Sequence, residues 1–407
     1  MITGNKVLRE IKYWGQILLL PIYAASHLIP RSKTIWAFGS TFGRRFADNP
    51  KYLYLFVSQY YSQFIAAVWI TKNRKIAEFL HKRGYKAYYL YSITGIWYSL
   101  RSKVYIYDNY TKDICYTLSG GSVKINLWHG IPLKKIQKDN IFDEVRNPST
   151  HRQKLRWILR RLTDEKPSHY VLTTSYNLVS IFSSAFRTQK VLTCGYPRND
   201  ILKSRLMPVV LSPEEEDFYS EIKCFQGKTI LYMPTFRDSE NRILKIIDLV
   251  SFQRELEKNQ LLFCFKLHPK SRLAEKLKAE IGNGYHNIKV MEPEYDPYPF
   301  LKEIDCLVTD YSSVYFDYLL LDRKIIFFDY DLEDYKAHSR EMYFDYKEVT
   351  PGPKVRTQEA LINAIISEDI YQKQRKHLKE KMFNADDCCA GERLYKKINE
   401  IINQGWR

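Results

Sequence analysis

Short apolar runs alternate with segments of helical periodicity along most of this chain of 407 residues. Residues 73–82, for example, carry apolar positions at helical spacing and stop before Gly84, a residue type that commonly ends helices. Strands of parallel sheets are buried on both faces, so they read as short apolar runs with helices between them. The first half of the chain is thus predicted to contain parallel strands at residues 34–38, 66–70, 88–91, 104–107, 123–127, 170–173 and 190–194.

The same alternation resumes after a polar, turn-rich stretch at residues 208–216. We therefore predict a first domain over residues 31–207, a second over residues 208–368, and helices over residues 369–407 that cross back to the first. Two doubly wound, Rossmann-like domains that face one another form a cleft at the carboxyl ends of their strands. This α/β arrangement is of the GT-B type, and its second sheet is expected to use strands at residues 229–233, 262–267, 288–291, 306–309 and 325–328.

The most apolar stretch near the start covers residues 13–30, but Gln16, Pro21 and His27 interrupt it. It falls short of the roughly 20 continuous apolar residues that a spanning helix needs. No small-residue cleavage site follows it, which argues against a signal peptide. We predict that residues 1–30 form an amphipathic leader that rests on an anionic membrane surface. A helix packed on the domain core is the alternative.

The chain is strongly basic, with 63 Lys and Arg against 46 Asp and Glu, a net charge of +17. Such a charge implies an anionic partner, which can be nucleic acid, an anionic bilayer or a phosphate-rich substrate. Residues 151–166 concentrate this charge in a predicted helix with Trp157 and Ile158 among the cations. That helix suits a lipid surface, a phosphate-rich acceptor or plain solvent. Nucleic acid is not expected as a partner, because most aromatic residues fall inside strand-like runs.

Several common cofactor signatures are missing from the sequence. It has no Gly-rich Lys loop of the nucleotide-binding type, no His-x-x-x-His pattern and no exposed paired carboxylates in an Asp-x-Asp arrangement. Its seven cysteines are scattered, without a CxxC pair, so neither a disulfide framework nor a zinc site is expected. We predict that the protein uses no metal and no cofactor.

His129 is the strongest candidate for catalysis in the first domain. It follows the predicted strand at residues 123–127 and precedes Gly130. A His at the carboxyl end of a parallel strand projects into the cleft, and its ordinary pKa near 6.5 suits a general base. Gly130 lets the backbone turn closely beside the ligand, and Lys134 follows on the side where we expect the acceptor. A purely structural histidine is the alternative.

Three successive strands of the second domain end in residues suited to a diphosphate. Arg237 and His268 follow two of them and offer charge-assisted hydrogen bonds. Ser312 and Ser313 follow a third and precede a predicted helix, where hydroxyls and backbone N–H groups form a natural phosphate cradle. Simple N-capping is the alternative for these two serines.

Four further residues of these strand ends are predicted to bind the ribose or polyol, or to support the other ligands. They are Lys266, Thr309, Asp310 and Asp317. Asp310 would repel a phosphate, so a ligand hydroxyl or the orientation of a neighbouring donor suits it better.

Six motifs occur in an order and spacing that resemble the CDP-glycerol glycerophosphotransferase family of teichoic acid primases and polymerases. The resemblance extends over about residues 34–365 and rests on residues 126–134, 195–200, 233–238, 266–269, 309–317 and 343–353. It implies a GT-B fold that acts on a CDP-polyol. It also implies that His129 is the catalytic base and that Arg237, His268, Ser312 and Ser313 hold the donor pyrophosphate.

The resemblance implies transfer of glycerol phosphate from CDP-glycerol to an undecaprenyl-diphosphate-linked acceptor, with release of CMP. Members work as peripheral proteins at the cytoplasmic face of the membrane. Polymerases of the family usually carry an extra N-terminal domain, so a short leader favours a primase or a capsule-type transferase. CDP-ribitol as the donor, or a nucleotide sugar on the same fold, are the alternatives.

Overall fold

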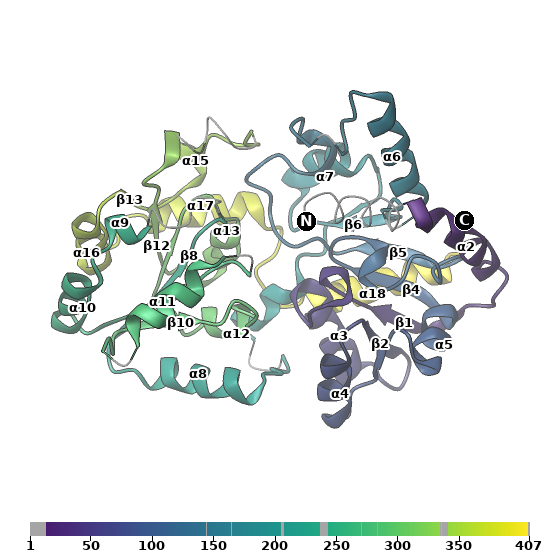
Figure 1. Ribbon diagram of the computed structural model, residues 1–407, viewed down its shortest axis with the longest axis horizontal. Coiled ribbons are helices and arrows are strands. Elements are labelled where there is room, and N and C mark those ends of the chain that lie inside the picture. The colour runs from purple at the N-terminus through teal and green to yellow at the C-terminus, as the bar shows by residue number, and fades with distance from the viewer. Residues whose placement is uncertain are drawn as a thin grey trace, which may run out of the picture.

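Two parallel sheets, each with helices packed around it, lie side by side in the computed structural model (Figure 1). The structure describes residues 14–143, 145–163, 165–204, 207–236, 243–269, 271–282, 284–333, 335 and 341–405. The first 13 residues of the predicted leader and Arg237 lie outside these ranges.

The first sheet has seven strands in the order β3-β2-β1-β4-β5-β6-β7, and every neighbouring pair is parallel. All seven predicted strands are present, although β3 ends two residues early and the edge strand β7 is shorter than expected. Their bounds are β1 Ser32–Phe38, β2 Ala66–Thr71, β3 Ala87–Tyr89, β4 Ser102–Tyr107, β5 Val123–Asn126, β6 Tyr170–Leu172 and β7 Val191–Leu192.

Helices cover both faces of this sheet, as its buried strands require. The helix α3 packs most of its length into the core, where Leu53, Leu55 and Val57 are fully buried. The helix α4 begins where the Asn73 side chain accepts a hydrogen bond of 3.0 Å from the Lys75 backbone N–H. The bounds are α3 Asp48–Tyr60, α4 Arg74–Lys82, α5 Ile93–Arg101, α6 His151–Leu162, η5 Tyr176–Leu178, α7 Val179–Phe186 and η6 Pro197–Leu202.

The second sheet has six parallel strands in the order β10-β9-β8-β11-β12-β13. The two-residue strand β13 was not predicted, since so short a run has no periodicity. The strands are β8 Lys228–Met233, β9 Leu261–Lys266, β10 Ile288–Met291, β11 Cys306–Thr309, β12 Lys324–Phe328 and β13 Lys354–Val355. The helices around them are α8 Pro213–Cys224, α9 Ile243–Ile246, α10 Leu249–Lys258, α11 Leu273–Ile281, α12 Tyr298–Leu301, α13 Val314–Tyr318, η8 Leu319–Leu321, α15 Tyr346–Val349 and α16 Gln358–Ile366.

The polar stretch predicted as a turn at residues 208–216 is shorter than expected. Helix α8 starts inside it at Pro213, because Ser212 and Glu215 form a reciprocal capping box. The Ser212 hydroxyl accepts from the Glu215 backbone N–H at 3.2 Å, and the Ser212 N–H donates to the Glu215 carboxylate at 2.8 Å. A Pro followed by acidic residues is a helix start as well as a turn signal.

Residues 369–407, expected to be helical, contain two helices, α17 (Gln372–Met382) and α18 (Ala390–Asn403). Helix α18 packs against the first domain (Figure 1) and is therefore the expected crossover helix. The backbone N–H groups of Ala390 and Gly391 donate to the Asp200 carboxylate at 3.0 and 2.8 Å. The Tyr395 ring stacks on Tyr61 with centroids 3.6 Å apart.

The described part of the leader contains η1 (Gly15–Leu19) and α2 (Leu20–Ser26). Ser26 fixes its end to the first domain by accepting a 2.9 Å hydrogen bond from the Gly120 N–H, whereas Leu18 and Ile22 remain exposed. Within the described ranges, no helix combines the length and apolar character that crossing a bilayer requires.

Candidate functional site

His129 lies in a tight turn at the carboxyl end of β5, and its side chain is exposed. The turn is fixed by Asn126, whose side-chain oxygen accepts a 2.8 Å hydrogen bond from the Trp128 N–H. The His129 Nδ1 lies 3.3 Å from the carbonyl oxygen of Asp108. With its proton on Nδ1, the ring donates to this carbonyl and leaves Nε2 as the proton acceptor. This is the arrangement that a general base requires.

Two buried carboxyl groups that the sequence analysis did not select lie behind His129. Asp108 accepts from the Ser40 hydroxyl at 2.7 Å, and Asp113 accepts from the Phe42 backbone N–H at 2.7 Å. Burial raises the pKa of Asp113 to about 6, and burial together with the nearby Asp113 raises the pKa of Asp108 well above its ordinary value. Asp108 directly follows β4, so the rule that selected His129 would also have found it.

Gly130 is the point where the His129 turn meets the second domain. Its φ of +145° lies in a region that residues with a side chain rarely adopt, and a side chain here would crowd its neighbours. A Cβ at this position would lie 3.1 Å from the Ser313 Oγ and 3.2 Å from the Arg198 Nη2. The turn that carries His129 therefore abuts the start of α13.

Arg198, in η6, joins the two domains behind this contact. It is 3% exposed, and its Nη1 donates to Asp48 at 2.7 Å and to the His129 carbonyl oxygen at 2.9 Å. Its Nη2 donates to Asp317, at 2.5 Å, and Asp317 also accepts from the Tyr298 hydroxyl at 2.6 Å. Asp317 is fully buried in this network. Its contacts therefore match the supporting role predicted for it and not contact with the ribose or polyol.

Asp310 and Thr309 hold the loop that follows β8. The Asp310 carboxylate accepts from the Thr235 N–H at 2.9 Å and from the Thr235 hydroxyl at 2.8 Å. The Thr309 hydroxyl donates to the Met233 carbonyl at 2.7 Å. Orientation of a neighbouring donor, one of the two roles considered for Asp310, matches these contacts.

Lys266 has the contacts of a supporting residue, one of the two roles predicted for it, whereas Lys134 reaches the second domain. The Lys266 ammonium is buried and donates to the carbonyl oxygens of Glu292 and Pro293, at 2.9 and 2.7 Å, so it supports the loop after β10. Burial lowers its pKa to about 7. The Lys134 ammonium was placed on the acceptor side, but it lies 3.5 Å from the Thr235 hydroxyl of the second domain.

Three of the predicted phosphate ligands, His268, Ser312 and Ser313, follow strands β9 and β11 of the second sheet. Ser312 and Ser313 are partly exposed, and Ser313 precedes α13 without its hydroxyl oxygen accepting a capping hydrogen bond. His268 is exposed, and its ring centroid lies 5.3 Å from that of Phe236. Both line a hollow of about 350 Å³ that is partly open to solvent. Arg237 follows Phe236 directly but lies outside the described residues.

A strap from the second domain, residues 341–343, pairs with the loop after the His129 turn. The Lys135 N–H donates to the Glu341 carbonyl at 2.7 Å, and the Tyr343 N–H donates to the Leu133 carbonyl at 2.9 Å. The Tyr343 hydroxyl then donates to the Asp139 carboxylate at 2.8 Å. This segment opens one of the six motifs, and its contacts give that motif a structural role.

The model of the family described as CDP-Glycerol:Poly(glycerophosphate) glycerophosphotransferase matches residues 22–400. A teichoic acid poly(glycerol phosphate) polymerase of Staphylococcus epidermidis is 30% identical over 343 residues, 79% of this chain and 44% of that protein. The chain thus spans less than half of that polymerase. A teichoic acid glycerol-phosphate transferase of Staphylococcus aureus is 27% identical over 398 residues, which are 93% of this chain and 96% of that protein.

Among solved structures, that of the wall teichoic acid polymerase TagF has a TM-score of 0.74 and 25% identity. The match covers 99% of this chain and 98% of that chain. With the two facing parallel sheets, it confirms the predicted GT-B fold.

Proposed function

Because this chain belongs to the CDP-glycerol:poly(glycerophosphate) glycerophosphotransferase family, we propose that it transfers glycerol phosphate from CDP-glycerol to a hydroxyl of a membrane-linked acceptor. The product is a unit of teichoic acid or a related cell-surface polymer, and CMP is released. The observation that carries this proposal is the contact between the His129–Gly130 turn and Ser313. It puts the candidate base beside the candidate phosphate site.

In the proposed reaction the acceptor hydroxyl attacks the β-phosphorus of CDP-glycerol. His129 Nε2 takes the hydroxyl proton as the new P–O bond forms. The bond from the β-phosphorus to the bridging oxygen breaks, and that oxygen leaves with CMP. Arg237, His268, Ser312 and Ser313 stabilise the negative charge on the phosphates. Phosphoryl transfer depends mainly on positioning and electrostatics, so these groups need not bond covalently to the substrate.

Within this proposal the first domain binds the acceptor and the second binds the donor. Asp310 and Thr309 keep the Thr235 loop in place, and Lys266 keeps the loop after β10 in place. Arg198 holds the carbonyl of His129 and the Asp317 side chain of α13 at a fixed separation. A ribitol-phosphate transferase that uses CDP-ribitol is the alternative, because both donors share the CDP half.

The donor is tested by incubating the protein with CDP-glycerol, CDP-ribitol and several nucleotide sugars, each with a synthetic lipid-linked acceptor. We expect CMP release with CDP-glycerol. Release of a nucleoside diphosphate from a sugar donor would instead identify a glycosyltransferase. His129→Ala is the matched variant: we expect turnover to fall by about 100-fold or more, as for loss of a general base, with CDP-glycerol affinity unchanged. Normal turnover of this variant would exclude His129 as the base.

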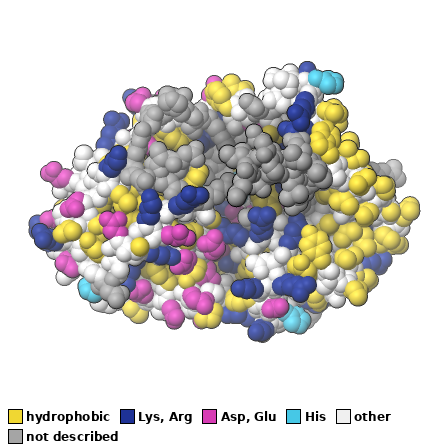
Figure 2. Space-filling view, viewed as in Figure 1, with side chains coloured by type: hydrophobic (Ala, Val, Ile, Leu, Met, Phe, Trp, Pro, Cys, Tyr) yellow, Lys and Arg dark blue, Asp and Glu magenta, His cyan; other side chains and the backbone are white. Residues whose placement is uncertain are grey.

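We further propose that the protein associates peripherally with the membrane through α2 and α5. Hydrophobic side chains gather on the side of the molecule where these helices lie (Figures 1 and 2). Leu18 of η1, which leads directly into α2, is 79% exposed, and Ile93 and Trp97 of α5 are 89% and 50% exposed. Arg31 joins the two helices by donating to the Ser26 carbonyl of α2 at 3.2 Å and to the Ser99 carbonyl of α5 at 2.9 Å. An exposed apolar face on a strongly basic protein suits the interface of an anionic bilayer.

A further inference from the structure

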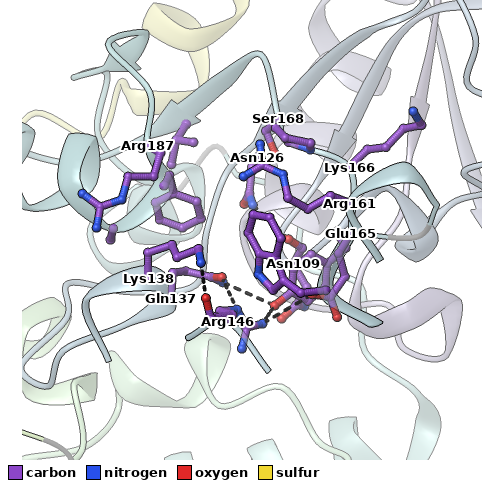
Figure 3. A pocket seen from close by; sticks show the side chains of 16 residues that line it. Asn109, Asn126, Gln137, Lys138, Arg146, Arg161, Glu165, Lys166, Ser168 and Arg187 are labelled. Carbon is purple, nitrogen blue, oxygen red and sulfur yellow. Dashed lines mark hydrogen bonds and ion pairs between the residues drawn. The ribbon is translucent and has the colours of Figure 1, made fainter. Parts of the chain in front are cut away.

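A second, strongly basic pocket lies in the first domain between α6, α7 and the loop after the His129 turn (Figure 3). The space within it is about 620 Å³, part of which is open to solvent. Five cationic side chains line it, whereas Glu165 is its one carboxylate among the described lining residues. The cations are Lys138, Arg146, Arg161, Lys166 and Arg187.

The cations of this pocket are held close to one another. Two of them make cation–π contacts with Trp157: the Lys138 ammonium lies 4.0 Å and the Arg161 guanidinium carbon 4.6 Å from its ring centroids. The pKa of Lys138 is lowered by burial first, and then by Arg161 and Arg187. Glu165 forms ion pairs with Arg160 at 2.8 Å and with Arg146 at 3.9 Å, and Asp143 also pairs with Arg146. These two carboxylates therefore offset the charge of Arg146 and leave the repulsion around Lys138. An anion in the pocket would relieve this repulsion.

The pocket is connected to the base by short contacts. Asn126 and Asn109 line it, and the Asn126 side chain donates to the Asn109 carbonyl at 2.9 Å. Asn126 also fixes the Trp128 N–H, and Asn109 follows Asp108, whose carbonyl faces the His129 Nδ1. An anion bound here therefore lies beside the turn that carries His129.

Helix α6 adds an apolar face next to the pocket. Leu155, Ile158 and Leu162 are spaced by three and four residues, so they share one side of the helix. They are 49%, 50% and 48% exposed. The same helix contributes Trp157 and Arg161 to the pocket. A helix that offers cations on one side and exposed apolar groups on another suits a ligand with both a charged head and a lipid chain.

We propose that this pocket binds the diphosphate of a lipid-linked acceptor and so positions the acceptor hydroxyl at His129. Lys138 and Arg161 donate charge-assisted hydrogen bonds to the diphosphate oxygens. The exposed face of α6 contacts the first carbons of the lipid chain. The inference rests on the proposed transferase function. The phosphodiesters of a growing polyol-phosphate chain present the same chemistry and form the competing source of anions.

The binding test uses the full chain with its donor side saturated by CDP, so that it needs no turnover. A short-chain lipid diphosphate is titrated by calorimetry into the wild type and into the double variant Lys138→Gln/Arg161→Gln. Loss of two charge-assisted contacts is expected to weaken binding by at least about tenfold. Lys154→Gln, which removes an exposed cation of α6 outside the pocket, is expected to leave the affinity unchanged. Equal affinity of the wild type and the double variant would overturn the proposal.

A second titration separates the two sources of phosphate. If a soluble glycerol phosphate oligomer depends on Lys138 and Arg161 while the lipid diphosphate does not, the pocket binds the polymer and the lipid assignment is wrong. In turnover assays the double variant is expected to raise the KM for the acceptor by about tenfold, with the KM for CDP-glycerol unchanged. A parallel rise in both would contradict an acceptor site. Absence of any CMP release would reject the transferase proposal and leave the calorimetric result to stand by itself.

Discussion

At the scale of single residues, burial shifts the pKa values of several groups in and around the candidate site. Lys266 is the clearest case, because its ammonium is buried against two carbonyl oxygens and its pKa falls to about 7. The unfolded chain keeps this proton up to the ordinary lysine value near 10.4. Between these pH values the unfolded state binds more protons than the folded state. The free energy of unfolding contributed by Lys266 therefore rises with pH in this window.

Lys266→Met should remove this pH dependence. For one proton the slope is at most about 1.4 kcal/mol per pH unit. The unfolding free energy of the wild type, relative to that of the variant, should therefore rise as the pH increases above neutrality. Urea unfolding followed by tryptophan fluorescence at several pH values measures it. Lys223→Met, at an exposed lysine of α8, is the control. Parallel profiles for the wild type and Lys266→Met would show that burial does not shift this lysine.

At the scale of elements, the decisive contact is between η6, the His129 turn and α13. Arg198 bridges Asp48 and Asp317, and both are left without a cation if it is removed. Breaking a buried ion pair from one side costs about 3–5 kcal/mol. Arg198→Gln should therefore lower the thermal unfolding midpoint by several degrees, as calorimetry would record. It should also reduce kcat more than donor affinity, because it releases the His129 carbonyl.

The control for Arg198 is Lys203→Gln. Lys203 also forms an ion pair, at 2.7 Å from Asp386, but its side chain is 35% exposed. Exposed pairs contribute about 0–1 kcal/mol, so its midpoint should change little. If both variants behaved alike, Arg198 would have no special part in joining the domains.

The elements also show what the sequence could and could not predict. Strand-end placement identified His129, Asp310 and Ser313, because a parallel sheet gathers its carboxyl ends at one edge whatever the details of packing. The same rule could not reveal Arg198. Its partners Asp48 and Asp317 are 150 and 119 residues away, and only the packed domains bring them together. Burial likewise favours the supporting role for Lys266 and Asp317. The identity of a residue alone does not reveal whether its side chain is buried.

At the scale of the whole molecule, the apolar face of α2 and α5 and the basic pocket both belong to the first domain. We expect the double variant Leu18→Ser/Trp97→Ser to sediment less with vesicles of equal parts phosphatidylcholine and phosphatidylglycerol. Ile370→Ser, at a 73% exposed residue near α17, is the matched control, since Leu18 is 79% exposed. Sedimentation that is equal for all three proteins would place the membrane contact elsewhere. Raised salt should weaken binding only in part, because the apolar contribution is not screened.

The position of α18 has a consequence for how the protein is made. Its Tyr395 packs against Trp36 and Tyr61, so residues 390–403 complete the core of the first domain. Domains usually fold in the order in which the ribosome releases them. Here the first sheet emerges early but must wait, with an apolar face uncovered, until the second domain and α18 have followed. We therefore expect the nascent chain to expose apolar surface, the kind that chaperones bind, until residues 390–403 have been synthesised.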